Sequence, residues 1–175
     1  MSRSFRSLLA LLPILFLAVP AMAITPGEVA PEFSAKDQDG REVKLSALKG
    51  RPVLLYFYPK DDTPGCTKEA CSFRDGWDKF KKLGVTIYGV SSQGADSHRK
   101  FKEKHRLPFD LICDEEGKVA ALFGVDRMPI IGLFKRQSVL IGRDGKVIRL
   151  YKDVDPSTHS AGVLRDVEEH LKSGI

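Results

Sequence analysis

The chain has 175 residues, 42% of them hydrophobic, with 28 lysines and arginines against 23 aspartates and glutamates. That length allows one domain with a substantial core, and no repeat, low-complexity tract or linker divides it. The basic residues gather at 79–82 and 98–106, on segments predicted to be helices with a solvated face. Without interleaved aromatic residues, this pattern indicates no nucleic-acid partner.

The first 23 residues are predicted to be a signal peptide. Arg3 and Arg6 precede an apolar run from Leu8 to Val19, and Ala21-Met22-Ala23 has small residues where a signal peptidase reads the chain. The run is short for a transmembrane span, so cleavage is favoured over a retained anchor. We therefore expect residues 24–175 to form one exported, periplasmic domain without stable membrane association.

The remaining chain predicts alternating strands and helices. A β-hairpin is expected around Asp39-Gly40, and continuously apolar segments predict strands buried on both faces. The predicted strands are 33–35, 42–45, 52–58, 85–90, 111–113, 136–141 and 146–151. The predicted helices are 64–83, 95–104, 118–123 and a last one from Asp155-Pro156 to a stop at Gly174, with a loop at 125–135. This order predicts an α/β domain with a mixed central sheet and helices on both faces.

Two of the three cysteines lie between Pro59 and Cys71, directly after the strand predicted at 52–58. The carboxyl end of a central strand is the usual place for a site in an open α/β sheet. Thr63 suits a helix N-cap and Pro64 the first helical position, so Cys66 falls in the first turn. Free backbone N–H groups and the helix dipole stabilise a thiolate there. Cys66 is the candidate nucleophile, and Cys71 is its nearest possible partner.

The spacing of these two cysteines bears on how they can pair. Residues five apart in an intact helix have Cα atoms about 8–9 Å apart, whereas a disulfide requires less than about 7 Å. A permanent disulfide, common in small exported domains, is therefore less favoured than a transient bond formed by local unwinding. The third cysteine, Cys113, lies in an apolar strand and is expected to be a buried small hydrophobe.

Polar residues outside this stretch give little indication of function. Arg74 is expected to order the helix through Asp75 or a loop carbonyl group. The histidines at 98, 105, 159 and 170 lie in polar stretches away from the stretch between Pro59 and Cys71. They indicate neither a set of metal ligands nor a catalytic base.

Phe57-Tyr58-Pro59, followed by Thr63-Pro64-Gly65-Cys66-Thr67 and Cys71, resembles the active-site segment of the peroxiredoxins. It is most similar to the peroxiredoxin Q branch, also called bacterioferritin comigratory proteins, whose motif is Pro-x-x-x-Thr-x-x-Cys with a second cysteine five residues on. The similarity extends from about Val29 to the end of the chain. The resemblance implies a thioredoxin-like fold, reduction of peroxides by a thiol cycle, and no cofactor or metal.

In that cycle the thiolate of Cys66 would attack a hydroperoxide and become a sulfenic acid. Cys71 would condense with it to an intrachain disulfide, which a thioredoxin-like dithiol protein would reduce. A resolving cysteine in the same chain removes the need for a partner subunit, so we expect a monomer. The hydroxyl of Thr63 and the N–H of Cys66 would stabilise the breaking O–O bond, and Pro59 would shield the pocket from water.

The resemblance also implies an arginine from a later strand. Arg136, placed before Leu140-Ile141, is the candidate, and Arg127 is the alternative. Gly142 stands where the branch usually has an acidic residue.

Two other functions are compatible with a thioredoxin-like fold. A thiol-disulfide oxidoreductase normally has two residues between its cysteines, whereas four separate Cys66 from Cys71. A copper-binding module would need closer cysteines and a histidine in a late loop, and Val125–Lys135 contains none.

Overall fold

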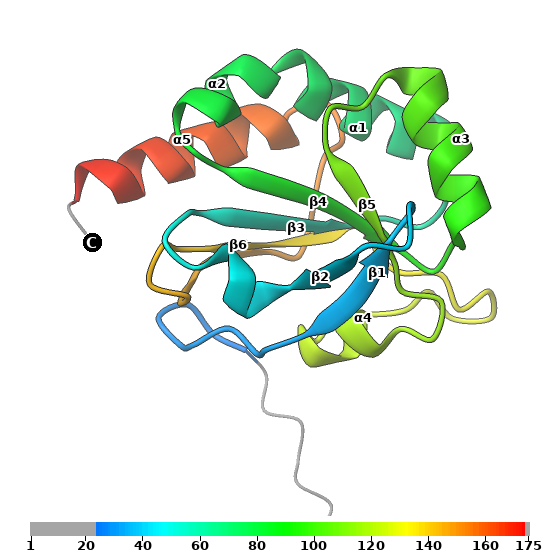
Figure 1. Ribbon diagram of the computed structural model, residues 1–175, viewed down its shortest axis with the longest axis horizontal. Helices are drawn as coiled ribbons and strands as arrows, with labels where there is room; N and C mark the ends of the chain where they lie inside the picture. The colour runs from blue at the N-terminus through cyan, green and yellow to red at the C-terminus, as the bar shows by residue number, and fades with distance from the viewer. Residues whose placement is uncertain (1–23, 174–175) are drawn as a thin grey trace, which may run out of the picture.

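A seven-stranded sheet forms the centre of the computed structural model, which describes residues 24–173 (Figure 1). The strands are β1 (Ser34–Asp37), β2 (Glu42–Lys44), β3 (Val53–Phe57), β4 (Thr86–Ser91), β5 (Asp110–Cys113), β6 (Gln137–Ile141) and β7 (Val147–Tyr151). The helices are α1 (Pro64–Asp75), α2 (Trp77–Lys82), α3 (Ala95–His105), α4 (Lys118–Leu122) and α5 (His159–Lys172), with a 3₁₀ helix at Leu45–Leu48. The predicted signal peptide, residues 1–23, lies outside the described residues.

The sheet is mixed, as predicted. Its strand order is β2-β1-β5-β4-β3-β6-β7, with β3, β4 and β5 parallel and the remaining neighbours antiparallel. The predicted hairpins are β1-β2 and β6-β7. None of the helices within residues 24–173 has the length and apolar character needed to span a membrane.

The central strand β3 is buried along its whole length because both of its faces are covered. Leu54 and Tyr56 pack towards α1, α2, α3 and α5, whereas Leu55 and Phe57 pack towards α4 and the segment that precedes β1. Figure 1 shows α1, α2 and α5 on one side of the sheet and α4 on the other. Burial of each large apolar side chain contributes about 1.5–3 kcal/mol. The continuous apolar run therefore fixes β3 at the middle of the domain.

The helix predicted over 64–83 is divided in two at Gly76, so that prediction is wrong in its length. A Cβ atom at Gly76 would lie 3.3 Å from the hydroxyl of Ser160, which belongs to α5. The same hydroxyl donates to the carbonyl oxygen of Ser72 at 3.1 Å. The break falls at a glycine, which is a poor helix former, and the close packing of α5 leaves little room for a larger side chain at this position.

The last helix begins at His159 rather than directly after Asp155-Pro156. The carboxylate of Asp155 accepts from the backbone N–H of Ser157 at 2.8 Å, which makes a turn instead of a cap. Thr158 is the residue before the helix. Because the helix begins later than predicted, His159 lies in the first turn of α5, and that turn packs against α1.

Candidate active site

The segment from Pro59 to Cys66 leaves the carboxyl end of β3 and enters α1. Pro64 occupies the start of the helix, and Cys66 in its first turn is only 1% exposed. Thr63 is the N-cap residue, but its side chain makes no capping bond; its hydroxyl donates to the carbonyl oxygen of Lys60 at 3.0 Å. The helix start is therefore where the sequence predicts it, whereas the hydroxyl of Thr63 orders the loop. Pro59 is half-buried beside it.

Arg136 reaches the sulfur of Cys66 because of the register between two strands. Phe57, at the end of β3, pairs with Gln137, at the start of β6, so residue 136 lies opposite the loop that leads to α1. Nη2 of Arg136 donates to Sγ of Cys66 at 3.3 Å. Gly65 leaves room for this contact, since a Cβ atom there would lie 3.2 Å from the same Nη2.

The alternative arginine is held elsewhere. Arg127 donates to the carbonyl oxygens of Gly132 and Glu116 at 2.9 and 3.2 Å, and its guanidinium lies 5.0 Å from the centre of the Phe134 ring. These contacts tie the loop before β6 to the turn that precedes α4. They leave Arg136 as the arginine next to Cys66.

Two buried residues complete the surroundings of Arg136, and sequence reasoning missed both. Glu69 has no exposed surface; one carboxylate oxygen pairs with Nη1 of Arg136, and the other lies 2.8 Å from Nδ1 of His159. The expectation that the histidines lie away from the Pro59–Cys71 stretch is therefore wrong for His159, and it is also wrong for His98 and His105, which contact Asp61 and Asp62. Glu69 follows Cys66 by three residues, a spacing that shares a helix face and could have indicated it. His159 is 90 residues from Glu69 and has no local signal.

Arg136 carries a positive charge beside the sulfur of Cys66. Burial alone would lower the pKa of Arg136, but the charge of Glu69 and the contact with Cys66 outweigh burial and raise that pKa. The guanidinium thus stays charged next to the first turn of α1. A cysteine with a cation and free backbone N–H groups beside it is suited to act as a thiolate nucleophile.

All three cysteines are free thiols. Cys66 and Cys71 both lie within the continuous helix α1, and Cys71 is partly exposed. Cys113 is also partly exposed, which corrects the expectation of a buried residue. Its burial, with additions from the carboxylates of Glu115 and Asp37, raises the pKa of Cys113 to about 11, so it remains a thiol.

Arg74 orders the end of α1, as predicted. Its Nε donates to Asp75 at 2.9 Å, and its Nη1 donates to the backbone carbonyl oxygen of His105 at 2.8 Å. The second contact joins α1 to the end of α3.

One group of carboxylates in the described residues has the spacing of metal ligands, formed by Asp37, Asp39 and Asp110. Arg41 pairs with all three carboxylates at 2.7–3.1 Å, and Lys102 also pairs with Asp110. These cations neutralise the cluster and join the β1-β2 turn to β5 and α3, so the contacts account for the cluster without an ion.

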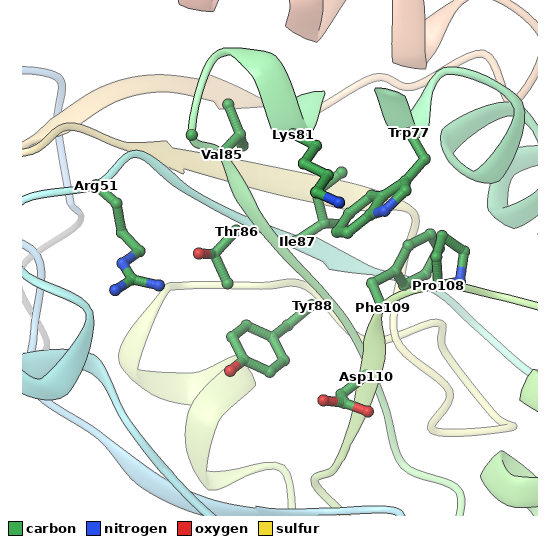
Figure 2. Close-up of a pocket in the computed structure, with 11 residues that line it drawn as sticks. Arg51, Trp77, Lys81, Val85, Thr86, Ile87, Tyr88, Pro108, Phe109 and Asp110 are labelled. Atoms are coloured by element: carbon green, nitrogen blue, oxygen red, sulfur yellow. The ribbon is translucent and has the colours of Figure 1, made fainter. Parts of the chain in front are cut away.

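Figure 2 shows a surface hollow of about 300 Å³ near the start of β3. Its walls include Arg51, Trp77 and Tyr88, and Thr86 of the wall pairs with the first residue of β3, Val53. Cys66 instead follows the last residues of that strand. None of the site residues expected from the sequence lines the hollow.

A reduced cysteine in the first turn of a helix that follows the central strand, with an arginine at its sulfur, defines a thiol-active protein of α/β architecture. Comparison with known proteins narrows this class. Residues 26–150 match the AhpC/TSA family, and the chain belongs to this family.

The chain is similar to peroxiredoxin Q, chloroplastic, of Oryza sativa subsp. japonica, with 46% identity over 143 residues, which are 81% of this chain and 66% of the rice protein. It thus spans just under two thirds of that relative's length. It is 42% identical to peroxiredoxin Bcp of Bacillus subtilis (strain 168), over 85% of this chain and 98% of that protein. The structure of peroxidoxin BcpB from Mycobacterium tuberculosis superimposes with a TM-score of 0.77 at 35% identity, over 83% and 97% of the two chains. The fold is thioredoxin-like, as expected.

The prediction of an exported, periplasmic protein is wrong by these comparisons. The relatives from rice and wheat are named as chloroplastic proteins. The prediction depended only on the charges, the apolar run and the small residues within 1–23, whereas the family match begins at residue 26. The shared domain does not require the compartment that those first residues indicated.

Proposed function

We propose that this protein is a thiol-dependent peroxidase that reduces hydrogen peroxide and organic hydroperoxides at Cys66. The observation that carries the proposal is the guanidinium of Arg136, 3.3 Å from a nearly buried sulfur at the start of α1. The names of the relatives, peroxiredoxin Q and peroxiredoxin Bcp, support the same chemistry. The substrate is a hydroperoxide, and the reductant is a thioredoxin-like dithiol protein.

In the first step, the thiolate of Cys66 attacks the terminal oxygen of the hydroperoxide. The O–O bond breaks, the other oxygen leaves as water or an alcohol after taking a proton, and the sulfur becomes a sulfenic acid. Arg136 and the N–H of Cys66 stabilise the charge that develops on the oxygens. The hydroxyl of Thr63 orders the loop and faces the peroxide, while Pro59 keeps water away.

In the second step, the thiol of Cys71 attacks the sulfenic sulfur, which releases water and forms an intrachain disulfide. The two cysteines lie on one helix, so α1 has to unwind between them before the sulfurs can meet. A dithiol protein then reduces the disulfide by exchange and is itself oxidised. Because both cysteines belong to one chain, we propose that the domain of residues 24–175 works as a monomer.

Single substitutions test this cycle. We expect Cys66→Ser to abolish peroxide consumption, because no other thiol lies next to Arg136. Cys71→Ser is expected to react once and then to accumulate sulfenic acid or an intermolecular disulfide, detected by mass spectrometry. Cys113→Ser is the matched control and should keep the activity of the unsubstituted protein.

Equal partial losses in the Cys66 and Cys71 variants would contradict the assignment of their roles. A protein that exchanges disulfides on other proteins but does not consume hydroperoxide would instead be a thiol-disulfide oxidoreductase. Peroxide consumption and dithiol exchange should therefore be measured on the same preparation.

A further inference from the structure

A buried carboxylate ties the loop before α1 to helix α3. Asp61 is 7% exposed and is the one buried residue between Tyr58 and Cys66. One of its oxygens accepts from the hydroxyl of Tyr58 at 2.7 Å. The other accepts from the hydroxyl of Ser97 at 2.6 Å and lies 2.9 Å from Nδ1 of His98. Three partners fix this carboxylate, and two of them belong to α3.

The ring of His98 is fully buried and has an acceptor at each nitrogen. Nδ1 faces the carboxylate of Asp61, and Nε2 lies 3.2 Å from the carbonyl oxygen of Ile112 in β5. The carboxylate and the carbonyl oxygen are both acceptors, so the ring of His98 is placed to donate a hydrogen bond from the nitrogen that carries its proton. Burial would raise the pKa of Asp61, but His98 and the two hydroxyl groups outweigh burial and lower it. The ring of His98 and the carboxylate of Asp61 therefore form a buried pair in direct contact.

A second group of contacts joins α3 to the same segment of chain on both sides of the cysteines. Asp62 has φ 56°, and its carboxylate lies 3.0 Å from Nζ of Lys104 and 2.8 Å from Nε2 of His105. Beyond Cys71, Arg74 donates to the carbonyl oxygen of His105 at 2.8 Å. Helix α3 thus holds the chain at residues 61, 62 and 74, and both redox cysteines lie between these points.

We propose that α3 is the fixed anchor of the redox-active segment and that His98 is a positioning residue within it. When Cys66 and Cys71 join, unwinding is confined to residues 63–73, while Asp61 stays bound to His98. This inference rests on the proposed function, because it concerns the disulfide of that cycle.

Two features connect the anchor to reactivity. The hydroxyl of Thr63 donates to the carbonyl oxygen of Lys60, the residue before Asp61, so displacement of Asp61 also displaces Thr63. The segment between the anchors is short and its ends are fixed, so unwinding releases little chain entropy and the helix can re-form after reduction.

Hydrogen exchange followed by mass spectrometry tests the proposal. The reduced protein and the protein oxidised with one equivalent of hydrogen peroxide are compared for the unsubstituted chain, His98→Gln and Lys100→Gln. Lys100 is an exposed residue of α3 and serves as the matched control. Oxidation of the unsubstituted chain is expected to raise exchange in residues 63–73 only. In His98→Gln, exchange should also rise in residues 58–62, and the reaction with peroxide should slow by about tenfold or more.

A second variant allows the test to be made even if His98→Gln does not fold. Ser97→Ala removes one donor to Asp61 from a partly exposed position, and we expect the same pattern of exchange at smaller amplitude. A rise in exchange over the whole chain in both variants would overturn the proposal, because it would indicate a general role in stability. Increased exchange in residues 58–62 on oxidation of the unsubstituted chain would overturn it as well.

Failure of the proposed function would look different. In that case the oxidised chain would contain no disulfide between Cys66 and Cys71, whatever its exchange pattern. In His98→Gln, the disulfide could instead form at the rate of the unsubstituted protein, with unchanged hydrogen exchange. That result would reject the role of α3 as an anchor and leave the proposed peroxidase function intact.

Discussion

Replacement of Glu69 by glutamine tests the arrangement around the sulfur most directly. The carboxylate of Glu69 accepts from Arg136 with one oxygen and from Nδ1 of His159 with the other. Glutamine has nearly the same shape, but its single oxygen can accept from only one of these donors. Its NH₂ group would face the other donor, and the negative charge that neutralises the guanidinium would be lost.

The size of the effect follows from the burial of Glu69. Removal of one partner from a buried ion pair costs about 3–5 kcal/mol, and Glu69 has no exposed surface through which water could compensate. For a domain of this size, each kcal/mol lowers Tm by about 2–4 °C, so we expect a decrease of about 6–20 °C. Arg136 would also lose one charge-assisted hydrogen bond that orients it, which is worth about 1.5–3 kcal/mol. If this loss raises the activation free energy by the same amount, the reaction with peroxide slows about 10- to 150-fold.

Stopped-flow mixing of the reduced protein with hydrogen peroxide measures this rate, with the fluorescence of the single tryptophan, Trp77, as the signal. Circular dichroism during heating gives Tm. Glu168→Gln, on the exposed side of α5, is the matched control and should change neither quantity. A Glu69→Gln protein with the original rate and the original Tm would refute the argument that Glu69 holds Arg136.

Three further outcomes are expected. Gly65→Ala places a Cβ atom 3.2 Å from Nη2 of Arg136 and should slow the peroxide reaction about two- to tenfold. Tm should not fall, because alanine favours the helix. An unchanged rate would show that the guanidinium can move freely. Burial alone would raise the pKa of Asp110, but Lys102, Gln38 and Arg41 together outweigh burial and lower that pKa. This carboxylate therefore stabilises the fold above about pH 4 and ceases to do so as the pH falls through its folded-state pKa. Asp110→Asn should therefore reduce the free energy of unfolding by about 1 kcal/mol or less at pH 7 and by a smaller amount near pH 3, measured by urea titration; a larger difference in acid would contradict this. Because the pKa of Cys113 is about 11, iodoacetamide should alkylate this thiol slowly at pH 8, and rapid labelling detected by mass spectrometry would be inconsistent with its surroundings.

Much of the fold can be predicted from local patterns in the sequence. The apolar run that forms β3 and the turn dipeptide Asp39-Gly40 each specify their element with nearest neighbours alone. The close approach of Ser160 to Gly76 cannot be predicted in this way, because it depends on how α5 packs against α1. The start of α5 cannot be predicted locally either. Asp155-Pro156 could begin a helix or form a turn, and in the structure Asp155 forms a turn with Ser157.

In the candidate site, too, some features follow from the local sequence and others depend on the tertiary structure. The sequence by itself determined that Cys66 lies in the first turn of a helix after a central strand, because Thr63, Pro64 and the apolar run before them are adjacent in the chain. Only the tertiary structure decided what surrounds the sulfur. Arg136 pairs with Glu69 across 67 residues of sequence, and Asp61 meets its partner on α3 across 37. Strand register and helix packing create these buried charge pairs, and neither leaves a periodic pattern in the sequence.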